Sequence, residues 1–371
     1  MVKENVPNQS SLDSNSSPKR NHIEQTLRTR IVSGDLRPGS RLPTRSELEA
    51  QFVVSSVTVQ LALDRLIEDG FVHAEGRRGT YVTEHPPHLF RYGLCFTGYP
   101  SSYPGWTRFW TALANEALRY QSGQPRRIAL FHGIDDRSDT DDSRRLLADL
   151  NMQRLAGVIF AMHPYVLAGT PFLEERGIPR VGIMAPGSYP GIGALDLDST
   201  SFLNKALDYF HARGRKRIAV LMVPGLWPTF YDQMARGLAL RGMSTQPYWA
   251  QLASPMAPEC ARNITHLLMQ ERAGERPDGL FVSDDNLVEH ATAGLIAAGV
   301  RVPDDLDVVA HCNFPWPTPS VLPAKRLGYD ARLVLRQCID YIDRKRSGLE
   351  VTSGMLVPAQ YEEEAALNLI S

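Results

Sequence analysis

Short polar side chains at the start of an expected helix, followed by two cations at an expected hairpin tip, form the most informative chemical pattern in this sequence. Ser56, Thr58 and Gln60 lie in the first turns of the helix predicted over SSVTVQLALDRLIEDG. The amino end of a helix carries free amide groups and a partial positive charge, so it favours phosphate. Arg77 and Arg78 follow between two short apolar runs. These residue types suit hydrogen bonds to base edges in a major groove and contacts to phosphates or a minor groove.

Three expected helices and a hairpin position these side chains. A first helix is predicted up to Gly34, because apolar residues recur every fourth position at Ile23, Leu27 and Ile31. In the segment 44–47 a threonine hydroxyl precedes a glutamate by three residues, and this capping box predicts a second helix that ends near Phe52. The third helix begins after Ser55 and ends at Gly70, and the runs 71–73 and 80–82 form the hairpin.

This order of elements resembles the GntR family of bacterial regulators. The match runs through IVSGDLRPGSRLPTRSELEAQF, VSSVTVQLALDRLIEDGFV and GRRGTYV, in the order of the family motif and without gaps. The resemblance implies a winged helix-turn-helix head that binds a double-stranded DNA operator. Carried over position by position, it implies a DNA-facing set of Thr44, Arg45, Ser55, Ser56, Thr58, Gln60, Arg77, Arg78 and Gly79.

The head departs from the usual pattern in two respects. The family usually has Arg where Ser56 and Gln60 stand, so the operator of better-known members does not transfer to this chain. Residues 21–85 contain 8 Lys and Arg against 9 Asp and Glu, so only the placement of cations such as Arg45 favours DNA. A winged helix can also bind protein, and this alternative stays open.

Length and composition indicate several domains. The 371 residues carry a formal net charge of -1 and are 43% hydrophobic, which supports two or three cores and no general attraction to polyanions. The 4 cysteines are far apart and form no CxxC, so neither a disulfide framework nor a zinc site is predicted.

Residues 1–20 have no apolar run, and we expect a disordered tail and a cytoplasmic protein. The head then spans 21–84, and 85–91 is a linker in which Pro86 and Pro87 stiffen the chain while His85 and His88 lie on the surface.

The remaining residues, 92–371, alternate short apolar runs with helical segments. The runs are rich in β-branched residues and lie at 92–96, 128–131, 157–160, 180–183, 218–222, 279–282 and 307–310. Strands spaced in this way predict parallel sheets covered by helices on both faces. The predicted fold class is therefore α/β, with two doubly wound lobes behind an N-terminal α+β winged helix-turn-helix.

Residues 92–360 resemble the effector domain of the LacI/GalR repressors, which has the fold of periplasmic sugar-binding proteins. The phrases that carry the resemblance are LAGVIFA, GIPRVGI, ALDLDSTSFLNKALDYFHARGRKRIAVL and GLFVSDDNLVEHATAGLIAAGVRVPDDLDVV. Combined with a GntR-type head, this body is similar to the arabinose-regulator subfamily. The resemblance implies two lobes that close over a small effector, a sugar or sugar derivative. The carboxyl ends of the strands are also where open α/β sheets generally bind ligands.

Aromatic and polar side chains near those strand ends are candidates for the effector site. Tyr99, Trp106 and Trp110 follow the first strand and Trp227 follows the run 218–222, where flat rings can stack on a sugar or simply pack in the core. The family resemblance implies Asp285 as a ligand-binding carboxylate, with a helix cap as the alternative role. Asn313 follows the last major strand, where a hydrogen-bonding Asp or Asn commonly lies. The family's ligand-gripping Arg is replaced by Met234, so the usual bidentate clamp is missing.

Together the two resemblances imply a homodimeric, ligand-responsive transcription regulator, a repressor rather than an activator. The chain lacks GxGxxG after a strand, GxxxxGK followed by Ser or Thr, HExxH and GxSxG, and we expect no enzyme activity, cofactor or metal. Two alternatives stay open. One is an aminotransferase-type body with a cofactor-bound lysine among Lys205, Lys216, Lys325 and Lys345. The other is a regulator whose body has lost ligand binding.

Overall fold

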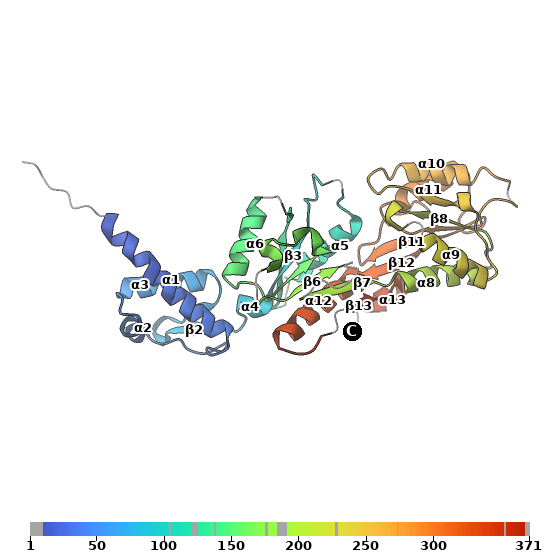
Figure 1. Ribbon diagram of the computed structural model, residues 1–371. Coiled ribbons are helices and arrows are strands. Elements are labelled where there is room, and N and C mark those ends of the chain that lie inside the picture. The colour runs from blue at the N-terminus through green and yellow to red at the C-terminus, as the bar shows by residue number, and fades with distance from the viewer. Residues whose placement is uncertain are drawn as a thin grey trace, which may run out of the picture.

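The computed structural model describes residues 10–367 apart from 104, 121–124, 137–138, 175–176, 184–190, 227–228, 273 and 352–353. Three parts follow one another along an elongated molecule (Figure 1). A small head lies at the N-terminal end, lobe 1 contains β3 (Arg91–Cys95), and lobe 2 contains β8 (Ile218–Met222). Lobe 1 therefore lies between the head and lobe 2.

The head has the predicted three helices and hairpin. They are α1 (Ser10–Val32), α2 (Arg45–Phe52), α3 (Ser56–Glu68), β1 (Val72–Ala74), the 3-10 turn η1 (Gly76–Arg78) and β2 (Thr80–Val82). The capping box before α2 is present, since the Thr44 hydroxyl accepts from the Glu47 amide and the Glu47 carboxylate accepts from the Thr44 amide. The predicted apolar positions of α1 and α3 are buried in one core, which explains why these segments form amphipathic helices.

Helix α1 begins earlier than expected. It starts at Ser10, within the segment predicted to be a disordered tail, and runs through Pro18. A helix that is already fixed by the packed residues 23–31 extends at little further cost, because nucleation is the expensive step.

Within the described residues no single helix is long and apolar enough to cross a membrane, while the bent pair α2 and α3 passes that test only when taken together.

Lobe 1 is built on a six-stranded parallel sheet in the order β13-β7-β6-β5-β3-β4. Besides β3, its strands are β4 (Arg127–Phe131), β5 (Gly157–Phe160), β6 (Arg180–Ile183), β7 (Ile192–Leu197) and β13 (Gly354–Val357). Its helices are α5 (Arg108–Tyr120), α6 (Asp141–Asn151), α7 (Pro171–Glu174) and α12 (Ala331–Arg346), with the 3-10 turn η2 (Pro164–Leu167). The strands are almost entirely apolar, as expected for a sheet covered on both faces.

Lobe 2 is built on a second six-stranded sheet in the order β14-β12-β11-β10-β8-β9, in which only the edge strand β14 runs antiparallel. Its strands besides β8 are β9 (Ala250–Leu252), β10 (Gly279–Val282), β11 (Asp307–Phe314), β12 (Lys325–Asp330) and β14 (Gln360–Tyr361). Its helices are α8 (Ser199–Ala212), α9 (Thr229–Leu240), α10 (Cys260–Leu268), α11 (Val288–Ala297) and α13 (Glu362–Leu367), with the turns η3 (Pro224–Leu226) and η4 (Pro247–Trp249). The prediction of two doubly wound lobes is confirmed.

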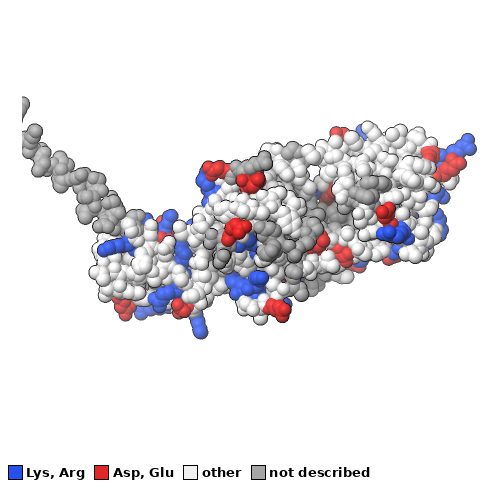
Figure 2. All heavy atoms as spheres, viewed as in Figure 1, with Lys and Arg blue, Asp and Glu red and all other residues white. Residues whose placement is uncertain are grey.

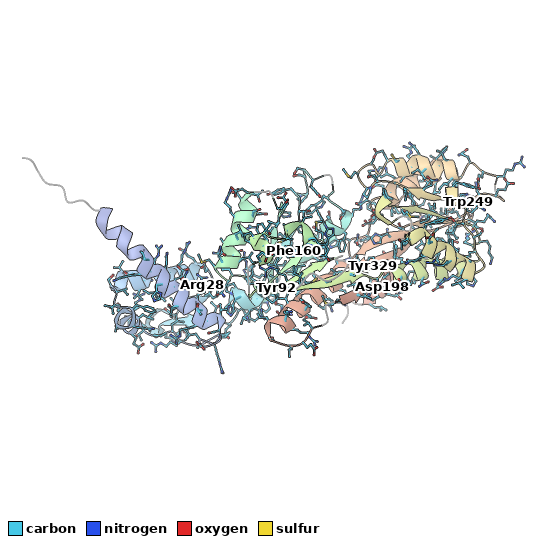
Figure 3. All side chains as sticks on the ribbon, in the orientation of Figure 1. Arg28, Tyr92, Phe160, Asp198, Trp249 and Tyr329 are labelled. Atoms are coloured by element: carbon cyan, nitrogen blue, oxygen red, sulfur yellow. The ribbon has the colours of Figure 1, made fainter. Side chains whose placement is uncertain are left out.

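The chain crosses between the lobes three times, from β7 to α8, from β12 to α12 and from β13 to β14. Two aspartates cap the helices that follow these crossings. Asp198 accepts from the Ser201 amide at the start of α8, and Asp330 accepts from the Arg332 amide at the start of α12. Figure 3 labels Asp198 together with Tyr329 in the region where the two lobes meet. One apolar cluster contains side chains of both sheets, so the lobes share a packed base.

A buried ionic network joins the head to lobe 1. The guanidinium of Arg28 lies 2.7 Å from the Asp69 carboxylate and donates to the Met152 carbonyl at 2.8 Å. Arg154 of lobe 1 lies 2.6 Å from the other Asp69 oxygen. Burial opposes ionisation of Asp69, but hydrogen bonds from the two arginines outweigh it and lower the pKa of this carboxyl. Figure 3 labels Arg28 in the head and Tyr92 just beyond the junction.

The expected linker is folded against both parts. Residues 87–90 form the short helix α4 (Pro87–Phe90), and the His88 ring stacks on Phe71 of the head at 5.7 Å between centroids. Arg346 at the end of α12 donates to the His88 and Leu89 carbonyls at 3.2 and 3.1 Å. His88 is therefore buried, contrary to its expected place on the surface. Burial, with a smaller contribution from Arg346, lowers the pKa of His88 to about 4.

Asp69→Asn should loosen the head from lobe 1, because it removes the carboxylate that Arg28 and Arg154 share and leaves each arginine paired only within its own part, with Glu24 in the head and Asp149 in lobe 1. Removing one partner of a buried ion pair costs about 3–5 kcal/mol. We expect a lower unfolding temperature and faster proteolytic cleavage within residues 85–91. Glu68→Gln is the matched control, since the neighbouring Glu68 forms only an exposed pair with Arg65. Equal cleavage of the two variants would contradict a role for Asp69 in docking.

Candidate functional site

The amino end of α3 presents polar side chains at the surface of the head. The Ser55 hydroxyl accepts from the Thr58 amide at 3.4 Å, and both Ser55 and Ser56 are exposed. Thr58 is only 8% exposed, and its hydroxyl lies 3.0 Å from that of Ser55. Thr58 shares a helix face with the buried Ala62, one turn later, and this explains why it points inward. The structure therefore places Thr58 apart from the exposed members of the predicted DNA-facing set.

Gln60 and the first residues of the α2 segment also form hydrogen bonds within the head. The Gln60 amide donates to the Asp64 carboxylate at 2.5 Å, and Gln60 is half-buried. Thr44 and Arg45 are exposed, although the Thr44 hydroxyl serves the capping box with Glu47. Arg45, the first residue of α2, is an exposed cation that forms no part of the cap.

The wing carries an exposed basic turn. Arg77 and Arg78 form η1 at its tip, and the Arg78 side chain is 82% exposed. Gly79 has a φ of 113°, and a Cβ at this position would lie 2.8 Å from Nε of Arg41. Arg41, which is exposed, thus lies against the wing as a third cation. Sequence reasoning missed Arg41, and the available signal was its position in the turn that leads into α2.

A cavity of about 550 Å³ lies between the lobes at the carboxyl ends of their strands. Lobe 1 contributes side chains that follow β5, lie at the end of β7 or lie near the start of α5. Lobe 2 contributes side chains that follow β8 and β10, lie toward the ends of β11 and β12, or belong to the first turns of α8 and α9. The lining residues are Thr107, Phe109, Trp110, Ala161, Met162, His163, Asp196, Leu197, Ser199, Phe202, Val223, Phe230, Ser283, Asp284, Asp285, Asn286, His311, Asn313 and Tyr329. This position is the one that the topology of the sheets predicted.

A hydrogen-bonded group of side chains forms the polar part of this cavity. Asp285 is 2% exposed and accepts from the Asn313 amide at 2.6 Å and from the Thr318 hydroxyl at 3.3 Å. The His311 ring nitrogen Nδ1 lies 3.7 Å from the other Asp285 oxygen. Burial, together with the neighbouring charge of Asp285, raises the pKa of Asp284. The cavity therefore contains two adjacent carboxyl groups, Asp284 and Asp285, that have little contact with water.

The structure brings together some of the predicted ligand-binding residues and separates others. Trp110, Asp285 and Asn313 line the cavity, whereas Tyr99 and Trp106 are not among the lining residues. The Tyr99 ring stacks near His132, and the Trp106 ring packs edge-on against Trp110, so both belong to the loop outside the cavity. Trp227 lies outside the described residues. Met234, which stands where the family usually has its ligand-gripping arginine, is fully buried in the core.

Sequence reasoning missed several lining residues. Asp284 precedes the chosen Asp285, and His163, His311 and Tyr329 lie at or just after strand ends. Asn313 was predicted from the rule that polar side chains near a strand end are candidates for the ligand site. The same rule, applied to every strand, would have identified these residues. Phe202 in α8 carries no such signal, because its place depends on the crossing between the lobes.

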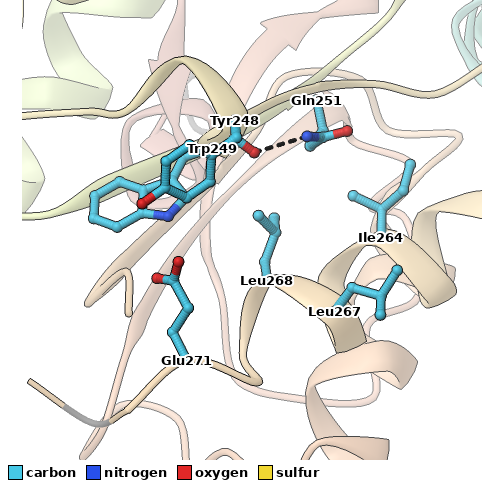
Figure 4. Close-up of a pocket in the computed structure, with 7 residues that line it drawn as sticks. All are labelled: Tyr248, Trp249, Gln251, Ile264, Leu267, Leu268 and Glu271. Atoms are coloured by element: carbon cyan, nitrogen blue, oxygen red, sulfur yellow. Dashed lines mark hydrogen bonds between the residues drawn. The ribbon is translucent and has the colours of Figure 1, made fainter. Parts of the chain in front are cut away.

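A second, smaller pocket lies on lobe 2, away from the interlobe cavity (Figure 4). Its volume is about 220 Å³, and Trp249, Ile264 and Leu268 give it an apolar wall. Glu271 lies close to the Tyr248 hydroxyl, and burial with this neighbouring charge raises the pKa of Tyr248. The pocket is too small for a drug-sized ligand and lies within one lobe, so it does not compete with the interlobe cavity as the candidate site.

Two family models match different parts of the chain. Residues 19–82 match the bacterial regulatory proteins of the gntR family, and residues 207–358 match the periplasmic binding protein-like domain. The arabinose metabolism transcriptional repressor of Halalkalibacterium halodurans is 21% identical over 89% of this chain and 91% of its own length. The repressor of the same name from Geobacillus stearothermophilus is 24% identical over 87% of this chain and 92% of its own length.

The mannosyl-D-glycerate transport/metabolism system repressor of Escherichia coli is 42% identical over 67 residues, so the chain spans only 28% of that relative. Among solved structures, a regulatory protein of the LacI family from Chloroflexus aggregans has a TM-score of 0.55 and 18% identity, over 74% of this chain and 96% of that one. A LacI family transcriptional regulator from Arthrobacter sp. FB24, in complex with lactose, has a TM-score of 0.55 and 18% identity, over 73% and 97%. The body thus has the predicted fold of periplasmic binding proteins and not that of an aminotransferase.

Arg78→Ala should weaken binding to every DNA sequence and reduce its salt dependence, because we expect this exposed wing cation to contact phosphates or a minor groove. Gln60→Ala should instead relax the choice of base, and each change should cost about 1–3 kcal/mol. Fluorescence anisotropy with an operator selected from random DNA measures both effects. Arg144→Ala, which removes an exposed arginine of lobe 1, is the control for charge. Wild-type binding by both variants would show that the assigned DNA face is wrong.

Proposed function

The chain joins a GntR-type winged helix-turn-helix head to a LacI/GalR-like body, and we propose that it is a transcriptional repressor whose operator affinity a small molecule controls. The small molecule binds in the interlobe cavity. One observation carries this proposal: a helix that begins at the cavity ends in contact with the linker segment that packs against the head. That helix is α12, which links a candidate effector site to a candidate DNA-binding surface.

The exposed groups of the head support operator binding. Ser55 and Ser56 lie at the amino end of α3, where short polar side chains fit a major groove. Arg77, Arg78 and Arg41 lie together at the wing, where cations fit phosphates or a minor groove. Val57 is 65% exposed on α3, and an apolar side chain in this position suits the methyl group of thymine.

The cavity supports a small effector. Its volume suits one compact ligand, and apolar rings with a few convergent polar groups are typical of such sites. The lactose complex of the Arthrobacter regulator and the names of the arabinose repressors favour a sugar or sugar derivative. Asp285, Asn313 and Trp110 are the predicted contacts. Contacts to both lobes would stabilise one interlobe angle, which is how a ligand shifts a population.

Helix α12 provides the connection between the two sites. It begins directly after Tyr329, which lines the cavity, and Asp330, which caps it. Its last residue, Arg346, holds the carbonyls of His88 and Leu89 in α4. A helix of this length is about 24 Å long and moves as a rigid element. A change of lobe angle at the cavity would therefore move the support of the head.

A homodimer completes the proposal. Isolated winged heads bind DNA weakly, and two heads related by a twofold axis match a palindromic operator. The spacing of the two heads then depends on the lobe angles, so effector and operator affinities are coupled in both directions.

Asp285→Ala should lower effector affinity by about 10–100-fold, since a hydrogen bond to a charged group contributes about 1.5–3 kcal/mol. Operator binding without effector should stay close to wild type, because Asp285 lies far from the head. Calorimetry with a panel of sugars and sugar derivatives measures the first effect, and anisotropy with operator DNA measures the second. Asp304→Ala removes an exposed carboxylate of the same lobe and serves as the control. An unchanged affinity in Asp285→Ala would leave Asp285 with a structural role only.

Arg346→Ala should weaken the operator's response to effector while leaving effector binding and operator binding each near wild type. The reason is that the variant cuts the contact of α12 with α4 but touches neither binding surface. The ratio of operator affinities with and without effector measures the coupling, which is typically about 5–150-fold in allosteric proteins. Arg344→Ala is the matched control, because Arg344 lies in the same turn and donates to Glu350 instead. A full response in Arg346→Ala would contradict transmission through this helix.

A further inference from the structure

The charged side chains of the interlobe cavity are all acidic. Asp196, Asp284 and Asp285 line it, and no Lys or Arg is among its described lining residues. The segments 184–190 and 227–228, which follow β6 and η3 in the chain, contain no Lys or Arg either. Nearby arginines have other carboxylate partners, since Arg108 pairs with Glu289 and Arg332 pairs with Asp330. Within the described residues no Lys or Arg therefore pairs with the acidic groups of the cavity, and the basic group beside them is the His311 ring.

The amide oxygen of Asn313 gives a second, independent indication of the ligand, because it is a buried hydrogen-bond acceptor without a donor among the described residues. Asn313 is 1% exposed and lines the cavity. Its amide nitrogen donates to Asp285 at 2.6 Å, which fixes the orientation of the amide because a carboxylate can only accept. The remaining oxygen, Oδ1, is buried and accepts no hydrogen bond from any described residue. A ligand that satisfies this oxygen must be a hydrogen-bond donor.

The apolar lining limits the rest of the ligand. Phe109, Trp110, Phe202, Phe230 and Tyr329 surround the polar group. Aromatic rings attract a cation through their faces and also pack against a ring or short aliphatic body. An anionic ligand would meet uncompensated carboxylates here. A neutral sugar would lack the bidentate arginine, because its position is occupied by the buried Met234.

We propose that the effector carries a protonated amino group on a ring or short apolar body, and that Asp284, Asp285 and Asn313 bind this group. The inference rests on the proposed function and names the chemical class of its effector. An ammonium group supplies several donors and one positive charge, which matches two carboxylates and an unpaired amide oxygen. An amino sugar is one ligand of this class.

The pH dependence follows from the groups around Asp284. Asp285, His311 and Asn286 face this carboxyl, and burial with the Asp285 charge raises its pKa, while His311 and Asn286 act in the opposite direction. Affinity for an amine should fall as the pH decreases through this raised pKa, because the carboxyl becomes neutral. In the free protein the ionised Asp284 is unfavourable, so Asp284→Asn should raise the unfolding temperature at neutral pH. This gain should disappear at low pH, where the wild-type carboxyl is protonated.

Matched pairs of compounds test the proposal on the full-length chain. We would compare glucosamine with glucose, galactosamine with galactose, and phenylethylamine with phenylethanol, by thermal shift and calorimetry. The amine of at least one pair should bind about 10–100-fold more tightly than its hydroxyl counterpart. Asp284→Asn should reduce that preference, whereas Asp304→Asn on the surface of the same lobe should not. Binding of the hydroxyl compounds as tightly as the amines, or no binding of any amine, would overturn the proposal.

Operator DNA separates this inference from the proposed function. A neutral sugar that binds and changes operator affinity would refute the amine but support the regulator. An amine that binds through Asp284 and leaves operator affinity unchanged would support this site and contradict the regulatory role. The stability of Asp284→Asn without ligand gives a third readout, since failure to raise the unfolding temperature at neutral pH would remove the electrostatic basis of the proposal.

Discussion

The contact of Asp69 with two arginines is the interaction on which the arrangement of this molecule depends. Asp69 is the C-cap of α3, the helix whose other end carries the candidate DNA contacts. Its two oxygens bind Arg28 of the head and Arg154 of lobe 1. Because α3 is a rigid rod, fixing one end of it on lobe 1 fixes the direction in which the other end points. Docking is thus specified at α3 itself rather than at the linker alone.

The energetics of this contact suit a head that is docked on lobe 1 and, under the proposed function, changes its position when an effector binds. A buried ion pair gains little net stability after desolvation, yet leaving one of its charges unpaired is costly. Glu24 and Asp149 also pair with the two arginines, so each arginine keeps a carboxylate partner when the contact to Asp69 is lost. The stacked His88 and the carbonyls held by Arg346 lie next to it. A small displacement of α12 would act on these packed and charged contacts rather than on a deformable loop.

Local sequence signals predicted the elements of the fold, and the sites depended on signals of longer range. The capping box at Thr44 and the four-residue spacing of Ile23, Leu27 and Ile31 are local, and the helices they predicted are present. The burial of His88 could not be read in this way, because it depends on Phe71 and Arg346, which lie far apart in sequence. The low exposure of Thr58 could not be predicted either, because the resemblance fixes its position in the motif but not the depth of its helix face.

The cavity shows the same division between topology and packing. The family resemblance implied Asp285 and the position after the last major strand indicated Asn313, and the two side chains lie in hydrogen-bonding contact. The rule that ligands meet the carboxyl ends of strands did not distinguish among aromatic residues of one loop, where Trp110 faces the cavity and Tyr99 and Trp106 do not. That choice depends on the start of α5, which sets which residues of the loop share a helix face. An aromatic residue is best assigned to a site only after the helix boundary beside it is known.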